Sequence, residues 1–167
     1  MTGDRIQIYC GTGSGKSAAA VGQAIRQACE GKSVFLVRFL KGKVGNELDY
    51  LRKLEPEIKL FSFDKFDEKY SELNEEEKQE ENLHIKNGLN YAKKVIVTSE
   101  CDMLILDEIL DLIHMEIITP EDVISLIEAA GEEMSLILTG TDRCEKLWPY
   151  ADVVTELTTL KEREIPD

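Results

Sequence analysis

The chain has 167 residues, of which 43% are hydrophobic and 32% charged, a balance typical of one compact globular domain. Its formal net charge of −13 argues against a general nucleic-acid-binding protein, because such proteins neutralise phosphates with lysine and arginine. No apolar run approaches the roughly 20 residues that span a bilayer, and no signal-peptide pattern begins the chain, so no membrane association is expected and the expected location is the cytoplasm.

Strand-like apolar runs alternate with helical patterns along the chain. In order, we predict a strand at 5–10, a helix at 16–31, a strand at 33–40, a helical segment at 46–54, a strand at 58–63, a helix at 74–99, strands at 102–108 and 134–140 separated by a helix at 120–130, a helical segment at 143–149 and a last strand at 151–157. Asn74 and Thr119 are good helix caps, and Pro120 suits a first helical position. This alternation predicts a single-domain α/β fold, with a mainly parallel sheet covered by helices on both faces.

Residues 64–82, DKFDEKYSELNEEEKQEEN, are strongly acidic. The simpler interpretation is a solvated loop followed by a helix start, since glutamates are favoured in the first helical turn. The functional alternative is a mobile lid that carries Phe66 and Tyr70 toward a ligand.

The stretch GTGSGKS at 11–17 lies between a predicted strand and a predicted helix, which is the place of a phosphate-binding loop. The usual pattern, G-x-x-x-x-G-K-[ST], would require glycine at position 10, where the chain has Cys10. Cys10 is interpreted as the last residue of the first strand. Lys16 would reach phosphate oxygens, and Ser17 would offer its hydroxyl to Mg²⁺.

Polar residues also follow other predicted strands. Asp107 and Glu108 end the run MLILDE, and either carboxylate would hold Mg²⁺ directly or through water. Because ligands of parallel sheets bind at the carboxyl ends of the strands, we expect the glycine loop, Asp107-Glu108 and Thr139-Gly140 to share one rim. Arg38 and Lys41 flank the end of the second strand, as ligand-binding residues or as ordinary surface residues.

At this point the sequence resembles the P-loop type ATP:corrinoid adenosyltransferases. GTGSGKS matches the shortened family loop G-x-G-x-G-K-[ST], including the missing glycine at Cys10. Further motifs resemble those of the family in the same order: FLKG at 39–42 followed by Glu47, ILDEI at 105–109, LILTGT at 136–141 and ADVVTEL at 151–157. The family arginine after L-T-G is replaced by Thr141, with Arg143 two residues on, and Tyr70 lies where the family has an aromatic pair facing the corrinoid.

The resemblance implies a P-loop NTPase-like fold and a reaction in which the Co(I) of cob(I)alamin attacks C5′ of ATP, so that tripolyphosphate leaves and a cobalt–carbon bond forms. It implies ATP, Mg²⁺ and a corrinoid as ligands, an electron-donating flavoprotein reductase as partner, and a homodimer. The implied catalytic residues are Lys16, Ser17 and Glu108, and the implied metal-binding residues are Ser17, Asp107 and Glu108. The implied ligand-binding residues are Gly11, Thr12, Gly13, Ser14, Gly15, Lys16, Ser17, Ala18, Arg38, Lys41, Glu47, Tyr70, Asp107, Thr139, Gly140 and Arg143.

Two other functions remain open from the residues. One is a different small P-loop enzyme, an ATPase or a nucleoside kinase, against which the shortened loop counts. The other is a non-catalytic nucleotide-binding relative that has lost the corrinoid site. This is favoured by the threonine after L-T-G and by the position of the only tryptophan, Trp148, far from the stretch around Tyr70.

Overall fold

The structure is a computed structural model that describes residues 3–40 and 48–166. In this part of the chain a six-stranded sheet has the strand order β3-β2-β4-β5-β1-β6, and all its neighbouring strands are parallel. The strands are β1 (Ile6–Cys10), β2 (Val34–Arg38), β3 (Ile58–Ser62), β4 (Met103–Asp107), β5 (Ser135–Thr139) and β6 (Val153–Glu156). The α-helices are α1 (Lys16–Cys29), α2 (Glu75–Val97), α3 (Ile109–His114) and α4 (Pro120–Ala129).

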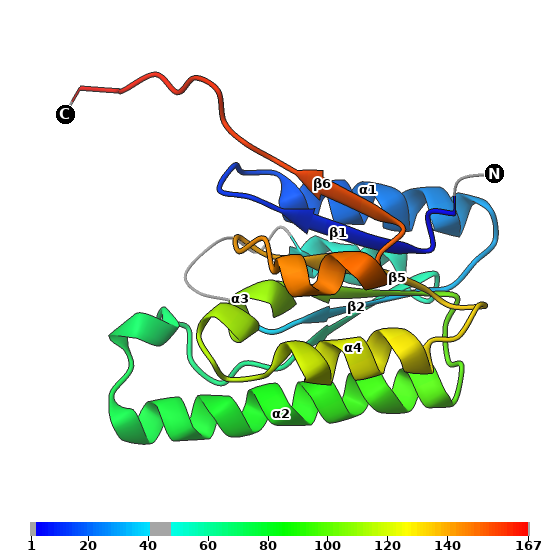
Figure 1. Cartoon of the computed structure of the whole chain (residues 1–167), viewed down its shortest axis with the longest axis horizontal. Coiled ribbons are helices and arrows are strands. Elements are labelled where there is room, and N and C mark those ends of the chain that lie inside the picture. The colour runs from blue at the N-terminus through cyan, green and yellow to red at the C-terminus, as the bar shows by residue number, and fades with distance from the viewer. Residues whose placement is uncertain (1–2, 41–47, 167) are drawn as a thin grey trace.

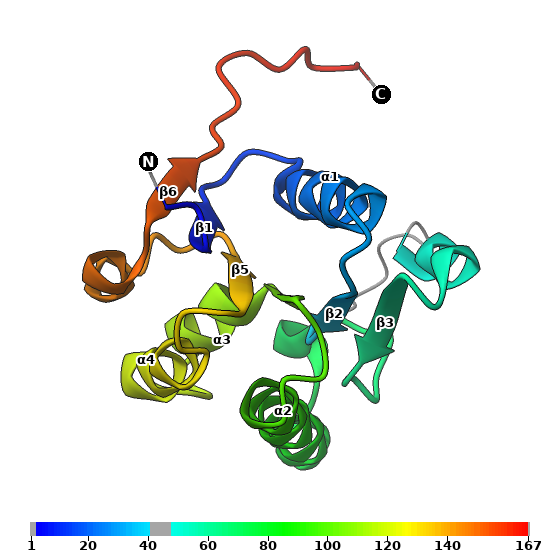
Figure 2. The same cartoon turned by 90° about the vertical axis from the view of Figure 1, so that its right-hand side faces the viewer.

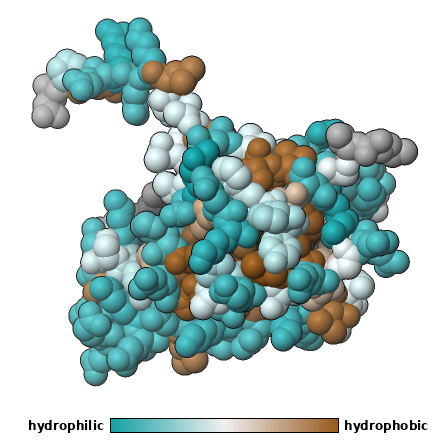
Figure 3. Space-filling model, in the orientation of Figure 1, coloured by the Kyte–Doolittle hydropathy of each residue, from teal (hydrophilic) through white to brown (hydrophobic). Residues whose placement is uncertain are grey.

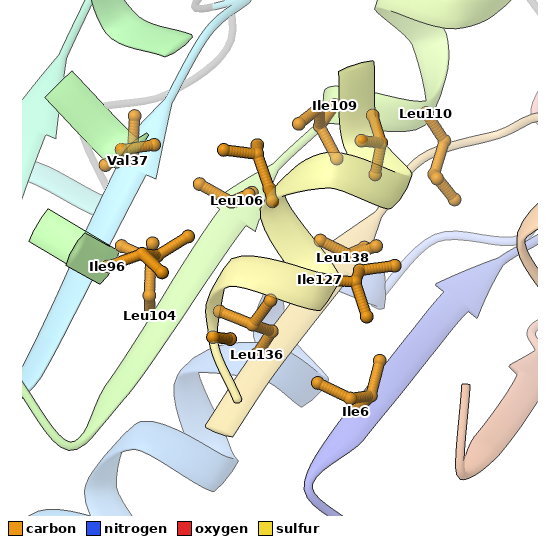
Figure 4. Close-up of a cluster of buried hydrophobic side chains, with 14 of the residues drawn as sticks. Ile6, Val37, Ile96, Leu104, Leu106, Ile109, Leu110, Ile127, Leu136 and Leu138 are labelled. Atoms are coloured by element: carbon orange, nitrogen blue, oxygen red, sulfur yellow. The ribbon is translucent and has the colours of Figure 1, made fainter. Parts of the chain in front are cut away.

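Helices cover both faces of the sheet, as predicted. Seen nearly along the strands, α1 lies on one side and α2, α3 and α4 lie on the other (Figure 2). The α1 side is a small core in which Ala20 and Ala24 pack against residues such as Leu36 and Ile105. The larger core lies on the opposite face, where Figure 4 shows Leu104, Leu106, Leu136 and Leu138 gathered with Ile127 of α4.

Local signals explain where two of the helices begin. The Asn74 side chain accepts a hydrogen bond from the Glu77 backbone N–H at 2.9 Å and starts α2. Thr119 and Asp122 form a capping box at the start of α4, with Pro120 in its first turn. Both predicted caps are therefore confirmed.

The two shorter helical segments have the tighter 3-10 form. They are η1 (Leu48–Leu54) and η3 (Glu145–Tyr150), and a third 3-10 turn, η2 (Tyr70–Glu72), precedes α2. Pro149 inside η3 lacks the N–H that a longer α-helix would need, and short segments commonly adopt 3-10 geometry. Within the described residues, no helix combines the length and apolar character required to cross a membrane.

The close packing of α2 on the sheet depends on Gly88. A Cβ atom at this position would lie 2.8 Å from Cε1 of Phe39 and 2.9 Å from Cβ of Phe63. We expect Gly88→Ala to lower the free energy of unfolding by about 1–3 kcal/mol, because an added methyl group must displace two packed aromatic side chains. Urea denaturation followed by circular dichroism measures this change. An unchanged midpoint would show that α2 can shift at no cost.

Candidate functional site

The candidate site is built where three neighbouring strands end. β5 lies between β1 and β4, so the glycine loop after β1, Thr139 at the end of β5 and Asp107 at the end of β4 meet at one edge of the sheet. Cys10 is buried and is the last residue of β1, as predicted, and it pairs in register with Glu156 of β6. The glycine loop therefore begins only at Gly11.

Helix α1 begins without a side-chain cap. The N-cap is Gly15, in a left-handed conformation with φ of 101°, and no side chain accepts a hydrogen bond from this helix end. An uncapped N-terminus of a 14-residue helix carries partial positive charge and suits an anion such as phosphate. Lys16 lies over the same loop, where its Nζ donates to the Gly13 carbonyl at 2.7 Å.

Asp107 connects the predicted parts of the site. Its Oδ1 accepts hydrogen bonds from the hydroxyls of Ser17 and Thr139, each at 2.8 Å. The Thr139 hydroxyl oxygen in turn accepts the Glu108 backbone N–H at 2.9 Å. Ser17, Asp107 and Thr139, which are far apart in the sequence, are thus joined in one hydrogen-bonded cluster.

The carboxyl groups of Asp107 and Glu108 lie in surroundings that disfavour their ionised forms. Burial raises the pKa of Asp107, although the hydrogen bonds from Ser17 and Thr139 and the charge of Arg38 oppose this shift. Burial, together with the neighbouring charges of Asp107 and Asp111, raises the pKa of Glu108 to about 8. A cation bound here would relieve both effects, and the available donors are hard oxygen atoms, the type that Mg²⁺ prefers.

Arg38 is a buried residue and not the surface residue that one interpretation of the sequence offered. Only 4% of it is exposed, and its Nη2 donates to the Ser62 hydroxyl at 3.0 Å. It lies opposite Asp107 in the register of β2 and β4, which places a fixed positive charge beside the carboxylate cluster. Lys41 and Glu47, the other two ligand-binding candidates of this region, lie outside the described residues.

Tyr70 lies in η2 beside a cavity of about 310 Å³ that also reaches Glu108. The lining is mixed: it includes apolar residues such as Leu40 and Met115, and the charged or polar residues Glu68, Lys69, Ser71, Glu81 and Glu108. The stretch around Tyr70 and the acidic end of β4 therefore share one space, although they are far apart in the sequence.

Arg143, by contrast, lies on the β6 side of the glycine loop. Its Nε is 2.9 Å from Oε2 of Glu156 and its Nη1 is 3.2 Å from Oε1 of Glu145, and it stacks over the ring of Trp148. Thr141, in the same connection, accepts the Gly11 N–H on its carbonyl at 3.1 Å. Gly140 donates its N–H to the Tyr9 carbonyl at 3.1 Å and so ties the end of β5 to β1.

Sequence reasoning missed the contact between the glycine loop and the segment after β6. The Gly13 N–H donates to the Leu157 carbonyl at 2.8 Å, and the Leu157 N–H donates to the Cys10 carbonyl at the same distance. These are main-chain groups, so no side-chain pattern could have signalled them. The pairing of His114 Nδ1 with Asp142 Oδ2 at 2.9 Å was missed as well, because it joins residues 28 positions apart.

Comparisons with known proteins agree with this geometry. The chain is 28% identical over 161 residues to a corrinoid adenosyltransferase of Escherichia coli K12, with 93% of this chain and 77% of the relative covered. It is 29% identical over 156 residues to the corrinoid adenosyltransferase CobA of Salmonella typhimurium, with the same shares covered.

Among solved structures, a DNA replication initiation factor matches with a TM-score of 0.44 and 15% identity, covering 91% of this chain and 39% of that one. The family model described as ATP:corrinoid adenosyltransferase BtuR/CobO/CobP matches residues 3–164. The chain therefore belongs to the ATP:corrinoid adenosyltransferase family.

Proposed function

We propose that this protein transfers the 5′-deoxyadenosyl group of ATP to the Co(I) of a reduced corrinoid, cob(I)alamin, and releases tripolyphosphate. The observation that carries the proposal is the cluster of Lys16, Ser17, Asp107 and Thr139 around a shortened glycine loop, in a chain whose family membership extends over residues 3–164. Membership gives the class of reaction, and the cluster provides groups suited to a polyphosphate.

The reaction requires little acid–base chemistry from the protein. The corrinoid substrate supplies the nucleophile as Co(I), which has no proton to lose, and the bond that breaks joins C5′ of ATP to its phosphate chain. The protein's tasks are to align the two substrates and to stabilise charge on the leaving phosphates. Lys16 and the N–H groups at the start of α1 are the groups we assign to that charge.

The metal-binding residues we propose are Ser17, Asp107 and Glu108. Their oxygen donors and the raised pKa values of both carboxyl groups fit a divalent cation. When bound, Mg²⁺ would neutralise phosphate charge at this edge of the sheet. Asp107 orients the Ser17 hydroxyl at 2.8 Å, and Thr139 holds Asp107 in place from the neighbouring strand.

The cavity beside Tyr70 is the place we propose for the corrinoid. It adjoins Glu108, and its apolar and aromatic lining residues, such as Leu40, Phe66 and Met115, offer a side against which part of a large, flat macrocycle would pack. Tyr70 and Phe66 would contact the corrinoid there, and the segment 64–82 would act as its cover. Arg38 would stabilise charge between the two substrates from its buried position beside Asp107.

The decisive experiment identifies both products. Purified protein with cob(I)alamin, ATP and Mg²⁺ should yield adenosylcobalamin, seen by its absorption spectrum, and tripolyphosphate, separated by ion-exchange chromatography. ADP with a phosphorylated acceptor would instead indicate a kinase, and orthophosphate without an adenosylated corrinoid an ATPase. Tight ATP binding without turnover would identify a non-catalytic relative.

We also propose a homodimer and an electron-donating flavoprotein reductase as partner, on the basis of the family. Sedimentation equilibrium of the purified chain tests the dimer. Reduction of cob(II)alamin in the presence of candidate flavoproteins tests the partner.

A further inference from the structure

The segment between β3 and α2 contacts α2 at several points. Phe63 packs against Gly88 of α2. Further along, the backbone N–H groups of Lys65 and Phe66 both meet the Glu81 side chain, and the Tyr70 hydroxyl donates to Asn82 Oδ1 at 2.9 Å. Figure 1 shows the last part of this segment, which contains the short helical turn η2, at the end of α2 where the helix begins.

Glu81 differs from the other glutamates around it. The surface over the start of α2 is hydrophilic (Figure 3), and Glu80 is half exposed and pairs with the Lys65 ammonium. Glu81 is only 3% exposed. A carboxylate is costly to bury, so a buried one normally has a specific task for its hydrogen bonds.

The hydrogen bonds of Glu81 define that task. Its Oε2 accepts the Lys65 N–H at 3.0 Å and the Phe66 N–H at 3.3 Å. Both donors belong to the segment and both bonds end on one oxygen atom, so one side chain fixes the backbone just before Phe66 enters the cavity wall. The hydrogen bond that the Tyr70 hydroxyl donates to Asn82 Oδ1 then fixes Tyr70, the other aromatic residue of the same wall.

We propose that Glu81 is a positioning residue for the second substrate: it holds the segment 64–73 so that Phe66 and Tyr70 form the wall of the cavity next to Glu108. This inference rests on the proposed function, because it assigns that cavity to the corrinoid. Among the described contacts Glu81 shares no hydrogen bond with Lys16 or Ser17, and its two hydrogen bonds hold the backbone of the segment that carries Phe66 and Tyr70. We therefore expect its loss to act on the corrinoid more than on ATP.

The test compares Glu81→Ala, Glu81→Gln and the control Glu80→Gln. Alanine suits a helix interior and removes both hydrogen bonds, whereas the glutamine carbonyl can accept both, since a single oxygen atom accepts them in the native chain. For Glu81→Ala we expect the KM for cob(I)alamin to rise about tenfold, with the KM for ATP changed by less than about twofold. Glu81→Gln should restore most of the affinity, and Glu80→Gln should match the native protein.

Amide exchange resolved by NMR gives a readout independent of activity. In Glu81→Ala the amides of Lys65 and Phe66 should exchange about tenfold faster, while the amides of β4 keep their protection. Equal increases in both KM values, or loss of protection throughout the chain, would show a merely structural role and overturn the proposal. So would an Ala variant with native exchange and a native KM for corrinoid.

Measurements on the native protein distinguish a failure of this inference from a failure of the proposed function. If it makes no adenosylcobalamin and binds no cob(II)alamin, the proposed function fails, and the assignment of the cavity fails with it. If the native protein is active and Glu81→Ala has the native KM for cob(I)alamin and native amide exchange, the function stands and the positioning role is wrong. Asn82→Ala, which releases Tyr70 without touching the Glu81 bonds, should raise the KM for corrinoid even if Glu81→Ala fails to fold. In that case a native KM for corrinoid in Asn82→Ala would overturn the proposal.

Discussion

Lys16→Ala is expected to reduce kcat/KM for ATP-dependent adenosylation by about 10²- to 10³-fold, because it removes a positive charge from the phosphates that leave in the transition state. In the structure the Lys16 ammonium is held over the glycine loop by the Gly13 carbonyl at 2.7 Å. A polyphosphate bound at the start of α1 would lie within reach of the same ammonium. Lys16→Arg should not restore full activity, since the broader guanidinium cannot occupy the position of a compact point charge.

Two measurements separate this effect from a loss of folding. ATP with Mg²⁺ should raise the unfolding temperature of the native protein, because a ligand that binds only the folded state stabilises it by mass action. Lys16→Ala should fold normally and lose most of that increase. Lys32→Ala, which removes an exposed lysine just beyond the other end of α1, should retain both the increase and the activity. Adenosylation by Lys16→Ala within about tenfold of the native rate would contradict the assigned role.

The residues that sequence could place were those with a local signature. The strands were recognisable because all residues of β1, β2 and β4 are buried and apolar runs of this kind suit a doubly covered sheet. Asn74 and Thr119 marked helix starts because a cap acts on neighbours only three residues away. The shared rim followed from topology, because the carboxyl ends of parallel strands lie at the same edge.

The residues that sequence could not place depend on distant partners. Nothing near Arg38 indicates that it is buried, since that follows from Ser62 and Asp107 on the two neighbouring strands. Glu81 is one of five glutamates between positions 75 and 81, and only the folded chain distinguishes it, through the backbone of Lys65 and Phe66. An acidic run that composition alone suggests to be a solvated surface therefore contains one residue with a buried role.

The displaced glycine of the phosphate loop has a physical explanation in the segment after β6. Leu157 pairs its N–H with the Cys10 carbonyl, so β1 remains strand-like through Cys10 and the turn begins one residue later. Gly11 has φ of 108°, a region that side chains disfavour, and a Cβ there would lie 2.3 Å from the Leu157 carbonyl oxygen. Backbone cannot move aside as a flexible side chain can, so glycine is required at position 11.

Gly11→Ala is therefore expected to lower the free energy of unfolding by about 2–5 kcal/mol, from backbone strain together with the collision. ATP affinity should fall by more than about tenfold, because the loop and the Leu157 strand end must separate. Gly22→Ala is the matched control, since a Cβ there meets nothing within 4 Å in α1 and alanine favours a helix by about 1 kcal/mol. In Gly22→Ala the unfolding temperature and the ATP affinity should each change in the direction opposite to that in Gly11→Ala, or not change at all. If Gly11→Ala unfolds at the native temperature and binds ATP normally, the contact with Leu157 does not determine where this loop begins.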